Sequence, residues 1–246
     1  MKRAAIGAGI GVWLALSMAS AVQAQSAAPP QVVVELFTSQ GCSSCPPADT
    51  LLREIAAQPG VLALSLHVDY WDYLGWEDTL AQPAFSMRQK AYAYAAEARA
   101  VFTPQAVVGG VVSMNGADGP ALRGQIANSA TLPQQVQLHV QREGTGWLLE
   151  ATASPPLPSE VVVQLVRYVP EVQVTILRGE NAGHQASYVN VATEWLTLAE
   201  WDGASPLHLE IPGDGMRLSA VIVQAVKPGG RYAALPGKIL AAARLD

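Results

Sequence analysis

The sequence lacks several features that would assign a function at once. It has only two cysteines, Cys42 and Cys45, which is too few for a small secreted scaffold held together by disulfides. It has no run of basic residues, which makes a nucleic-acid binder a poor interpretation. Beyond the N-terminal segment, no second hydrophobic run is long enough to span a bilayer. Half of the residues are hydrophobic, so the chain is not a disordered one.

The N-terminus has the pattern of an export signal. Lys2 and Arg3 precede an uncharged stretch, and Val22-Gln23-Ala24 follows at the position where a signal peptidase cleaves. We predict a signal peptide over residues 1–24, with an uncleaved membrane anchor as the alternative. Cleavage would leave 222 of the 246 residues, with 13 basic and 20 acidic side chains and a formal charge of −7. We therefore expect a periplasmic or secreted protein that is not embedded in a membrane after cleavage.

The first part of the mature chain alternates short apolar runs with helical segments. Gln31–Thr38 is rich in β-branched residues, as a buried parallel strand is. Pro46-Pro47 is compatible with the first turn of a helix, and Gly109-Gly110 is a strong hairpin signal. The predicted order is β-α-β-α-β-β-α, with elements over 31–38, 46–58, 61–68, 83–100, 105–108, 111–114 and 120–129.

After Leu132 the pattern changes to alternating apolar and polar residues. Short stretches such as Val161–Leu165 and Val172–Ile176 are separated by clusters of glycine, proline and acidic residues. Such repeated short strands are typical of an antiparallel sandwich. We therefore predict two successive domains: an α/β domain over residues 25–132, and an all-β, sandwich-like domain over residues 133–246.

The two cysteines form a Cys-x-x-Cys motif between a predicted strand and a predicted helix. A helix N-terminus stabilises a thiolate, and the thiolate is the nucleophile of disulfide exchange. We expect Cys42 to be the more exposed and more reactive thiol and Cys45 to be the resolving thiol. The alternative is a purely structural disulfide. Closing a four-residue loop, however, would contribute only roughly 2 kcal/mol on the loop-entropy model.

Metal binding by the cysteine pair is a further alternative. Zinc would need four ligands, whereas copper(I) can be held by two thiolates with a distant histidine. His67 ends a predicted strand and is the best placed of the four histidines, although a structural role is the simpler interpretation for a lone strand histidine. The full set is His67, His139, His184 and His208. We expect no bound cofactor and no resident metal.

Two other positions are candidates for the same site. Thr103-Pro104 precedes a predicted strand, where a cis proline would face the cysteines. Glu35 is the one charged residue in the first buried strand, and a buried acid beneath a thiol pair can relay protons. The alternative for Glu35 is a strand-end side chain that points to solvent.

An aromatic loop follows the second predicted strand. Parallel strands open their sites at their carboxyl ends, so this loop should emerge beside Cys42. Tyr70, Trp71, Tyr73 and Trp76 would then wall a substrate groove, or some of them would instead cap the core.

These motifs resemble those of the thioredoxin superfamily. More closely, the chain resembles a family of secreted thioredoxin-like bacterial proteins of unknown function. The matching stretches are Glu35–Asp49, His67–Asp78, Phe102–Val108, Arg178–Gly183 and Trp201–Gly203. The resemblance implies a thioredoxin-like fold for the α/β domain, with Cys42 as nucleophile, Cys45 as resolving thiol, Thr103-Pro104 as a cis pair and Glu35 as the buried acid. Gly41, in place of the usual aromatic residue, and Pro46-Pro47 depart from the superfamily pattern.

The sequence thus predicts an exported thiol–disulfide oxidoreductase. Its partners would be protein thiols or disulfides and a redox partner protein, with no nucleic acid. The alternative is a non-enzymatic exported binding protein, which would hold copper(I) on the cysteine pair or bind a protein or glycan through the β domain.

Overall fold

The computed structural model describes residues 31–245, apart from 158, 216 and 230–233. The predicted signal peptide lies outside these residues. The helical segments are α1 (Pro46–Ala56), η1 (Asp72–Leu74), α2 (Pro83–Ala95) and α3 (Gly119–Ala130). The strands are β1 (Val32–Thr38), β2 (Val61–His67), β3 (Gln105–Val108), β4 (Val112–Asn115), β5 (Val136–Glu143), β6 (Gly146–Ala153), β7 (Val161–Thr175), β8 (Gln185–Trp201), β9 (Leu207–Ile211), β10 (Leu218–Pro228) and β11 (Ala234–Arg244).

Through residue 130, the order of the elements is the predicted one, with the short helix η1 added. β1 and β2 are parallel, β1 and β3 are antiparallel, and Pro46 begins α1. The helix α2 ends at Ala95 rather than at Ala100, because Glu97 takes a positive φ of 53° that the helix cannot continue through.

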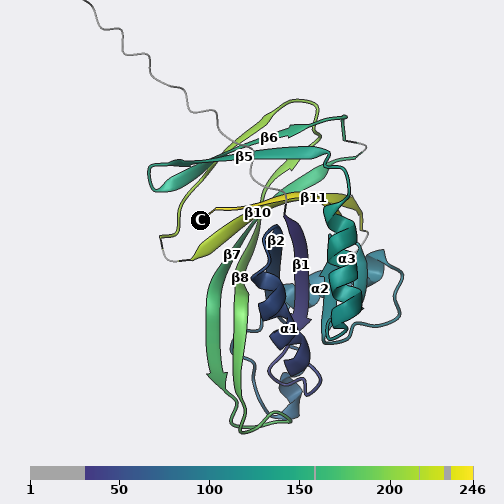
Figure 1. Cartoon of the computed structure of the whole chain (residues 1–246), viewed down its shortest axis with the longest axis vertical. Coiled ribbons are helices and arrows are strands. Elements are labelled where there is room, and N and C mark those ends of the chain that lie inside the picture. Colours follow the sequence, from purple (N-terminus) through teal and green to yellow (C-terminus); the bar gives the residue numbers. More distant parts are fainter. Residues whose placement is uncertain (1–30, 158, 216, 230–233, 246) are drawn as a thin grey trace, which may run out of the picture.

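The predicted fold class, a thioredoxin-like α/β domain followed by a separate all-β domain, is wrong. One mixed sheet of eight strands has the order β11-β10-β7-β8-β2-β1-β3-β4, and a smaller sheet has the order β5-β6-β9 (Figure 1). The two parts of the chain join where β8 pairs in parallel with β2, at Ser65 and Val191. Alternation of apolar residues identifies strands and their faces, but it does not identify their partners. The predicted boundary near Leu132 falls between α3 and β5.

Both parts of the chain also share a hydrophobic core. The core beneath α2 combines Phe37 and Phe85 from the first part with Val166, Tyr168 and Ile222 from the second. Since these side chains pack in one cluster, the long strands β7 and β10 extend the sheet of the first part rather than forming an independent sandwich.

The helices divide between the two faces of the large sheet. On β10, Ile222 packs in the core beneath α2, whereas its neighbours Val221 and Val223 pack against the small sheet. On β1, Val34 and Leu36 pack against α1 and α3. One face of the large sheet therefore carries α2, and the other carries α1, α3 and the small sheet (Figure 1).

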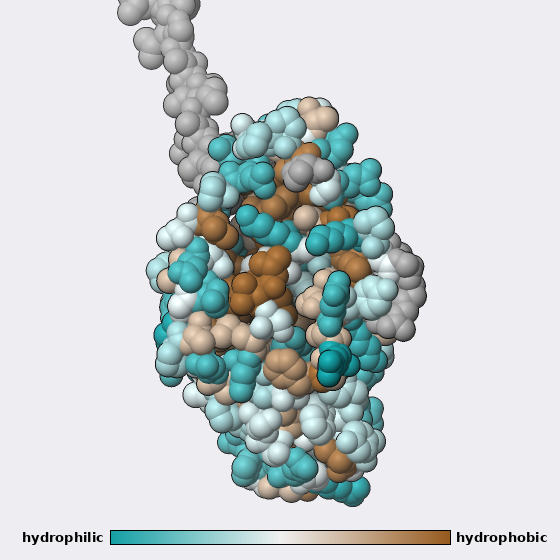
Figure 2. All heavy atoms as spheres, turned by 90° about the vertical axis from the view of Figure 1, so that its right-hand side faces the viewer, coloured by the Kyte–Doolittle hydropathy of each residue, from teal (hydrophilic) through white to brown (hydrophobic). Residues whose placement is uncertain are grey.

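The surface leaves a few large hydrophobic side chains exposed on different elements. They are Tyr73, Met87, Tyr94, Phe102, Val111, Leu132, Leu177 and Leu196. On the side shown in Figure 2, hydrophobic residues gather in a limited central patch that polar residues border. Within the described ranges, no helix combines the length and hydrophobicity needed to cross a bilayer.

Candidate functional site

The cysteine pair lies at the N-terminal end of α1. β1 ends at Thr38, a short loop follows, and Cys45 is the N-cap residue of α1 with helical dihedral angles. The amide of Cys45 donates to the carbonyl of Cys42 at 3.2 Å, and the turn brings the two Cα atoms to 5.4 Å. The two side chains form a disulfide within this turn. The oxidised pair therefore sits where the partial positive charge of a helix N-terminus would stabilise a thiolate after reduction.

The Thr103–Pro104 peptide bond is cis and lies next to the cysteine loop. The hydroxyl of Ser44 donates to the Thr103 carbonyl at 3.4 Å and lies 3.4 Å from the Cys42 sulfur. Ser44 thus bridges the disulfide turn and the segment that enters β3.

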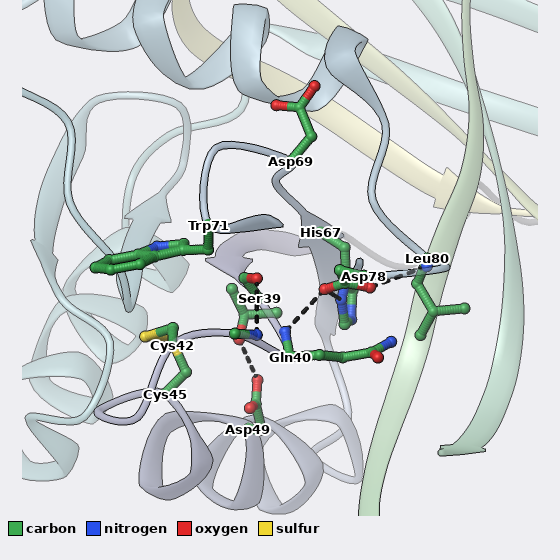
Figure 3. A network of polar contacts seen from close by, with 12 residues as sticks. Ser39, Gln40, Cys42, Cys45, Asp49, His67, Asp69, Trp71, Asp78 and Leu80 are labelled. Carbon is green, nitrogen blue, oxygen red and sulfur yellow. Dashed lines mark hydrogen bonds and ion pairs between the residues drawn. A yellow bond between two sulfur atoms is a disulfide. The ribbon is translucent and has the colours of Figure 1, made fainter. Parts of the chain in front are cut away.

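Trp71 closes over this junction. Figure 3 shows the Trp71 indole beside Cys42. Its Nε1 donates to the Thr103 hydroxyl at 2.7 Å, and a Cβ on Gly41 would lie 3.1 Å from the Trp71 Cβ. Both cysteines are buried, with Cys42 1% and Cys45 0% exposed, so the expected difference in exposure between them is very small. Gly41 has no side chain, which lets the indole approach the cysteine loop.

The other three aromatic residues of the loop have different environments. Trp76 donates from Nε1 to the side-chain oxygen of Gln40 at 2.8 Å, and so contacts the loop that leads to Cys42. Tyr70 packs against the core beneath α2, whereas Tyr73 is 78% exposed. The structure brings Trp71 and Trp76 to the site, uses Tyr70 to cap the core and leaves Tyr73 in solvent.

Asn181 reaches the same loop from the connection between β7 and β8. Its amide nitrogen donates to the carbonyls of Gln40 at 2.9 Å and of Cys42 at 3.0 Å, and its side chain is buried. The second part of the chain therefore holds the backbone of the cysteine loop. The sequence signal was present in the Arg178–Gly183 stretch, which carried the family resemblance but was not connected to the cysteine site.

Glu35 does not lie beneath the cysteine pair. Neighbouring side chains of β1 point to opposite faces, and Glu35 shares the face of Val33 and Phe37, which is covered by α2. It is fully buried, so the solvent-facing alternative is wrong. Its carboxylate accepts from Arg88 Nη2 at 3.0 Å and from the Tyr92 hydroxyl at 2.6 Å, which satisfies its charge within the α2 face.

A different group of buried ionisable residues lies on the cysteine side of the sheet (Figure 3). Asp49 of α1 accepts a hydrogen bond from the Thr38 hydroxyl at 2.8 Å. His67 donates from Nδ1 to Asp78 at 2.7 Å, and Asp78 also accepts from the Gln40 amide at 2.8 Å. His67 is completely buried, and its Nε2 has no hydrogen-bond partner among the described residues.

Burial and neighbouring charges set the protonation of this group. Burial raises the pKa of Asp49 to about 6, although His67 and the Thr38 hydrogen bond act in the opposite direction. Burial also acts to raise the pKa of Asp78, but hydrogen bonds from His67 and two backbone amides outweigh it and hold that pKa below its usual range. Asp49 is thus the acid of this group that titrates nearest to neutrality.

A cavity of about 560 Å³ lies beside this group, between α1 and the far end of the β7–β8 hairpin. The residues that line it include Asp49, Asn181 and Tyr188, together with Ser39 of the cysteine loop and Pro46 at the start of α1. The face of α1 that carries Asp49 therefore borders an open cavity, which neither cysteine lines.

Sequence reasoning did not identify Asp49 as part of the site. An acidic residue in the first turn of a helix is ordinarily explained by the helix dipole, and Asp49 fits that pattern. The available signal was its spacing, four residues after Cys45, on a face that also carries the apolar Leu52.

The arrangement around His67 does not favour the copper(I) alternative. The Nδ1 atom of His67 is engaged with Asp78, on a side chain that is completely buried. In the part of the chain that the structure describes, no three histidine, cysteine, aspartate or glutamate side chains are grouped as a metal site.

Comparisons with known proteins place this geometry in context. A family model described as a protein of unknown function, DUF1223, matches residues 33–225. A crystal structure of a protein from Agrobacterium tumefaciens is similar, with 31% sequence identity over 90% of this chain and 96% of that chain and a TM-score of 0.75. HBP35 of Porphyromonas gingivalis shares the fold at 13% identity, covering 88% of this chain and 74% of that chain, with a TM-score of 0.57. No curated protein gives a significant match.

Proposed function

We propose that this chain, which belongs to the DUF1223 family of proteins of unknown function, is an exported thiol–disulfide oxidoreductase that acts on protein thiols or disulfides. The observation that carries the proposal is the Cys42–Cys45 disulfide at the N-terminus of α1, beside the cis Thr103–Pro104 bond. We propose that the site uses the chemistry of the thioredoxin superfamily within a differently extended sheet.

The small size of the disulfide loop supports a redox role over a structural one. A loop of four residues gives roughly 2 kcal/mol on the loop-entropy model, whereas a loop of about 100 residues would give nearly 5 kcal/mol. The oxidised pair and the predicted signal peptide both favour an oxidising compartment outside the cytoplasm.

The reaction begins with the reduced pair. The Cys42 thiolate attacks a substrate disulfide, forms a mixed disulfide and releases the first substrate thiolate. Cys45 loses its proton and attacks the Cys42 sulfur, which re-forms the Cys42–Cys45 bond and releases the second substrate thiolate. Two electrons pass from the cysteine pair to the substrate, and a dithiol partner protein would restore the reduced state. The same steps in reverse would oxidise a substrate dithiol.

Access to Cys42 requires Trp71 to move. The indole donates one hydrogen bond to Thr103, which contributes only about 1 kcal/mol net, and it also packs against Tyr70 and the core beneath α2, so moving it costs these contacts as well. A polypeptide that displaces the indole would meet exposed apolar surface at Phe102, directly before Thr103. This surface favours a protein substrate over a small hydrophilic disulfide.

The test uses the reduced protein and a disulfide-bonded model peptide. The Cys45→Ser variant should accumulate a mixed disulfide on Cys42, detected by mass spectrometry after acid quenching, and the Cys42→Ser variant should form none. The Ser43→Ala variant is the matched control within the motif, because Ser43 is exposed, and it should exchange like the natural protein. Full exchange by Cys42→Ser would contradict the proposal.

A further inference from the structure

Asp49 shares a helix face with Cys45, one turn further along α1. The Asp49 amide donates to the Cys45 carbonyl at 3.1 Å, and Cys45 has helical dihedral angles of −79° and −34°. Side chains four residues apart on a helix lie on the same face. Both are buried, with Cys45 0% and Asp49 7% exposed. The helix face that carries Cys45 therefore also carries a buried acid, Asp49, whereas Glu35 of β1 points to the other face of the sheet.

Groups from several elements face Asp49. Thr38 of β1 donates a hydrogen bond to it. Three further residues interact with it electrostatically: His67 of β2, Asp78 of the loop before α2, and Tyr188 of β8. Arg53, one turn further along α1, is engaged by Glu171 of β7 and by Ser187, and so does not form an ion pair with Asp49. His184 is a further ionisable residue in the lining of the adjoining cavity. The buried carboxylate consequently has hydrogen-bond and electrostatic partners without a dedicated cation.

The cavity between α1 and the β7–β8 hairpin connects Asp49 to solvent. Asp49 is part of its lining, whereas neither cysteine is. On the other side of the cysteine loop, Trp71 and Ser44 cover the disulfide. Asp49 is therefore the acid that shares the buried helix face of Cys45 and also lines an open cavity.

We propose that Asp49 is the proton carrier of Cys45, and that the cavity between α1 and the β7–β8 hairpin is the route by which this proton exchanges with water. The inference rests on the proposed function and deepens it. In the mixed disulfide, the Asp49 carboxylate takes the proton of the Cys45 thiol, and the Cys45 thiolate breaks the bond between Cys42 and the substrate. The Asp49 carboxyl then releases its proton to water in the cavity. In the reverse direction, the protonated Asp49 returns the proton to Cys45.

The protonation of Asp49 fits this role. Burial raises its pKa to about 6, so that both the acid and the carboxylate are populated near neutral pH. His67 lowers the pKa of Asp49 and Asp78 raises it, so the buried His67–Asp78 pair helps to set the pKa of the proposed proton carrier.

The test isolates the second step of the exchange. Reduced protein is mixed with the same disulfide-bonded model peptide, quenched with acid at intervals and analysed by mass for the mixed disulfide and for the closed Cys42–Cys45 form, between pH 5 and 9. In the natural protein we expect the closing rate to rise through pH of about 6 and then level off. In Asp49→Asn we expect closing at pH 7 to slow about 100-fold, and the rise through pH of about 6 to disappear, with the rate instead increasing up to pH 9 as the thiol ionises directly.

The matched control is Glu54→Gln. Glu54 lies on the same helix, pairs with Arg123 at the surface and is 59% exposed, so this variant loses the same charge without touching the site. It should close like the natural protein. If Asp49→Asn forms the mixed disulfide and closes with the natural pH profile, the inference is overturned while the proposed function stands. If the natural protein neither closes the Cys42–Cys45 bond nor forms a mixed disulfide with the peptide, and Cys45→Ser traps none, both fall.

A second measurement needs no variant in the site. The carboxyl carbon of Asp49 in ¹³C-labelled protein is titrated by NMR in the disulfide and dithiol forms. Proton sharing with Cys45 predicts different midpoints in the two forms, because coupled groups titrate together. Identical midpoints would overturn the inference even if Asp49→Asn failed to fold.

Discussion

Each face of the large sheet buries a carboxylate, and the two carboxylates have different hydrogen-bond and charge partners. On the α2 face, Glu35 is matched by the guanidinium of Arg88 and by the Tyr92 hydroxyl, and Arg88 also stacks 3.8 Å from the Trp195 ring centroid. On the α1 face, Asp49 has a hydrogen bond from Thr38 and an open cavity beside it, and no described residue forms an ion pair with it. The difference separates a buried acid whose charge is matched within the core from one whose charge is not, and only the second is proposed to carry a proton.

We expect the largest loss of stability when the cation that pairs with Glu35 on the α2 face is removed. Arg88→Met leaves Glu35 buried without a cation, which we expect to lower the free energy of unfolding by about 3–5 kcal/mol. Urea unfolding at pH 7 measures it. The double variant Glu35→Gln/Arg88→Met should recover part of the loss, because no charge is left uncompensated. A loss below about 1 kcal/mol for Arg88→Met would remove the distinction between the two faces.

The next effect concerns the pH dependence of stability on the α1 face. The pKa of Asp49 is raised in the folded protein, from 3.8 to about 6, so its folded form binds a proton more tightly than the unfolded chain. The stability that this acid contributes is present below pH of about 4 and is lost as the pH rises to about 6 and beyond. The rise in pKa corresponds to roughly 3 kcal/mol.

Asp49→Asn removes this titration. From pH 4 to pH 8, the unfolding free energy of the oxidised variant should therefore gain about 2.5 kcal/mol relative to the natural protein, because a small part of the change occurs below pH 4. Urea unfolding at both pH values provides the measurement, and Glu54→Gln is the surface control. A difference that stays constant between the two pH values would contradict the account.

A smaller effect is expected where the second part of the chain holds the cysteine loop. Asn181→Ala removes two hydrogen bonds to the cysteine loop. The Gln40 carbonyl loses the donor that Asn181 supplies, while the Cys42 carbonyl keeps its hydrogen bond from the Cys45 amide, and we expect a cost of about 1–3 kcal/mol. Reduction of the disulfide by dithiothreitol should also become faster, because the loop is held less firmly. The exposed Asn128→Ala is the control, and equal reduction rates in the two variants would argue against a role for the β7–β8 hairpin in the site.

The features that could be predicted from the sequence are local ones. The run Val32–Thr38 and the Pro46-Pro47 pair specify a strand and a helix start within about 15 residues of Cys42, so the position of the cysteine pair follows directly. Likewise, Gly109 and Gly110 both adopt the positive φ angles that the hairpin signal implies.

The features that could not be predicted depend on contacts between residues that are far apart in the sequence. The alternation in β7 and β8 is the same whether these strands form a sandwich or extend the sheet from β2, and the single parallel contact at Val191 decides between the two. Asn181 reaches a carbonyl 139 positions away in the sequence, which no local pattern encodes. Glu35 has the right residue type, but the pleat of β1 turns it to the other face.

The reduction potential of Cys42–Cys45, measured by equilibration with glutathione and by counting free thiols by mass, tests the central claim most directly. A working thiol–disulfide oxidoreductase predicts a value between about −120 and −270 mV. A value well below about −300 mV would mean a disulfide too stable to exchange with the glutathione pool, and would contradict a redox function for this site.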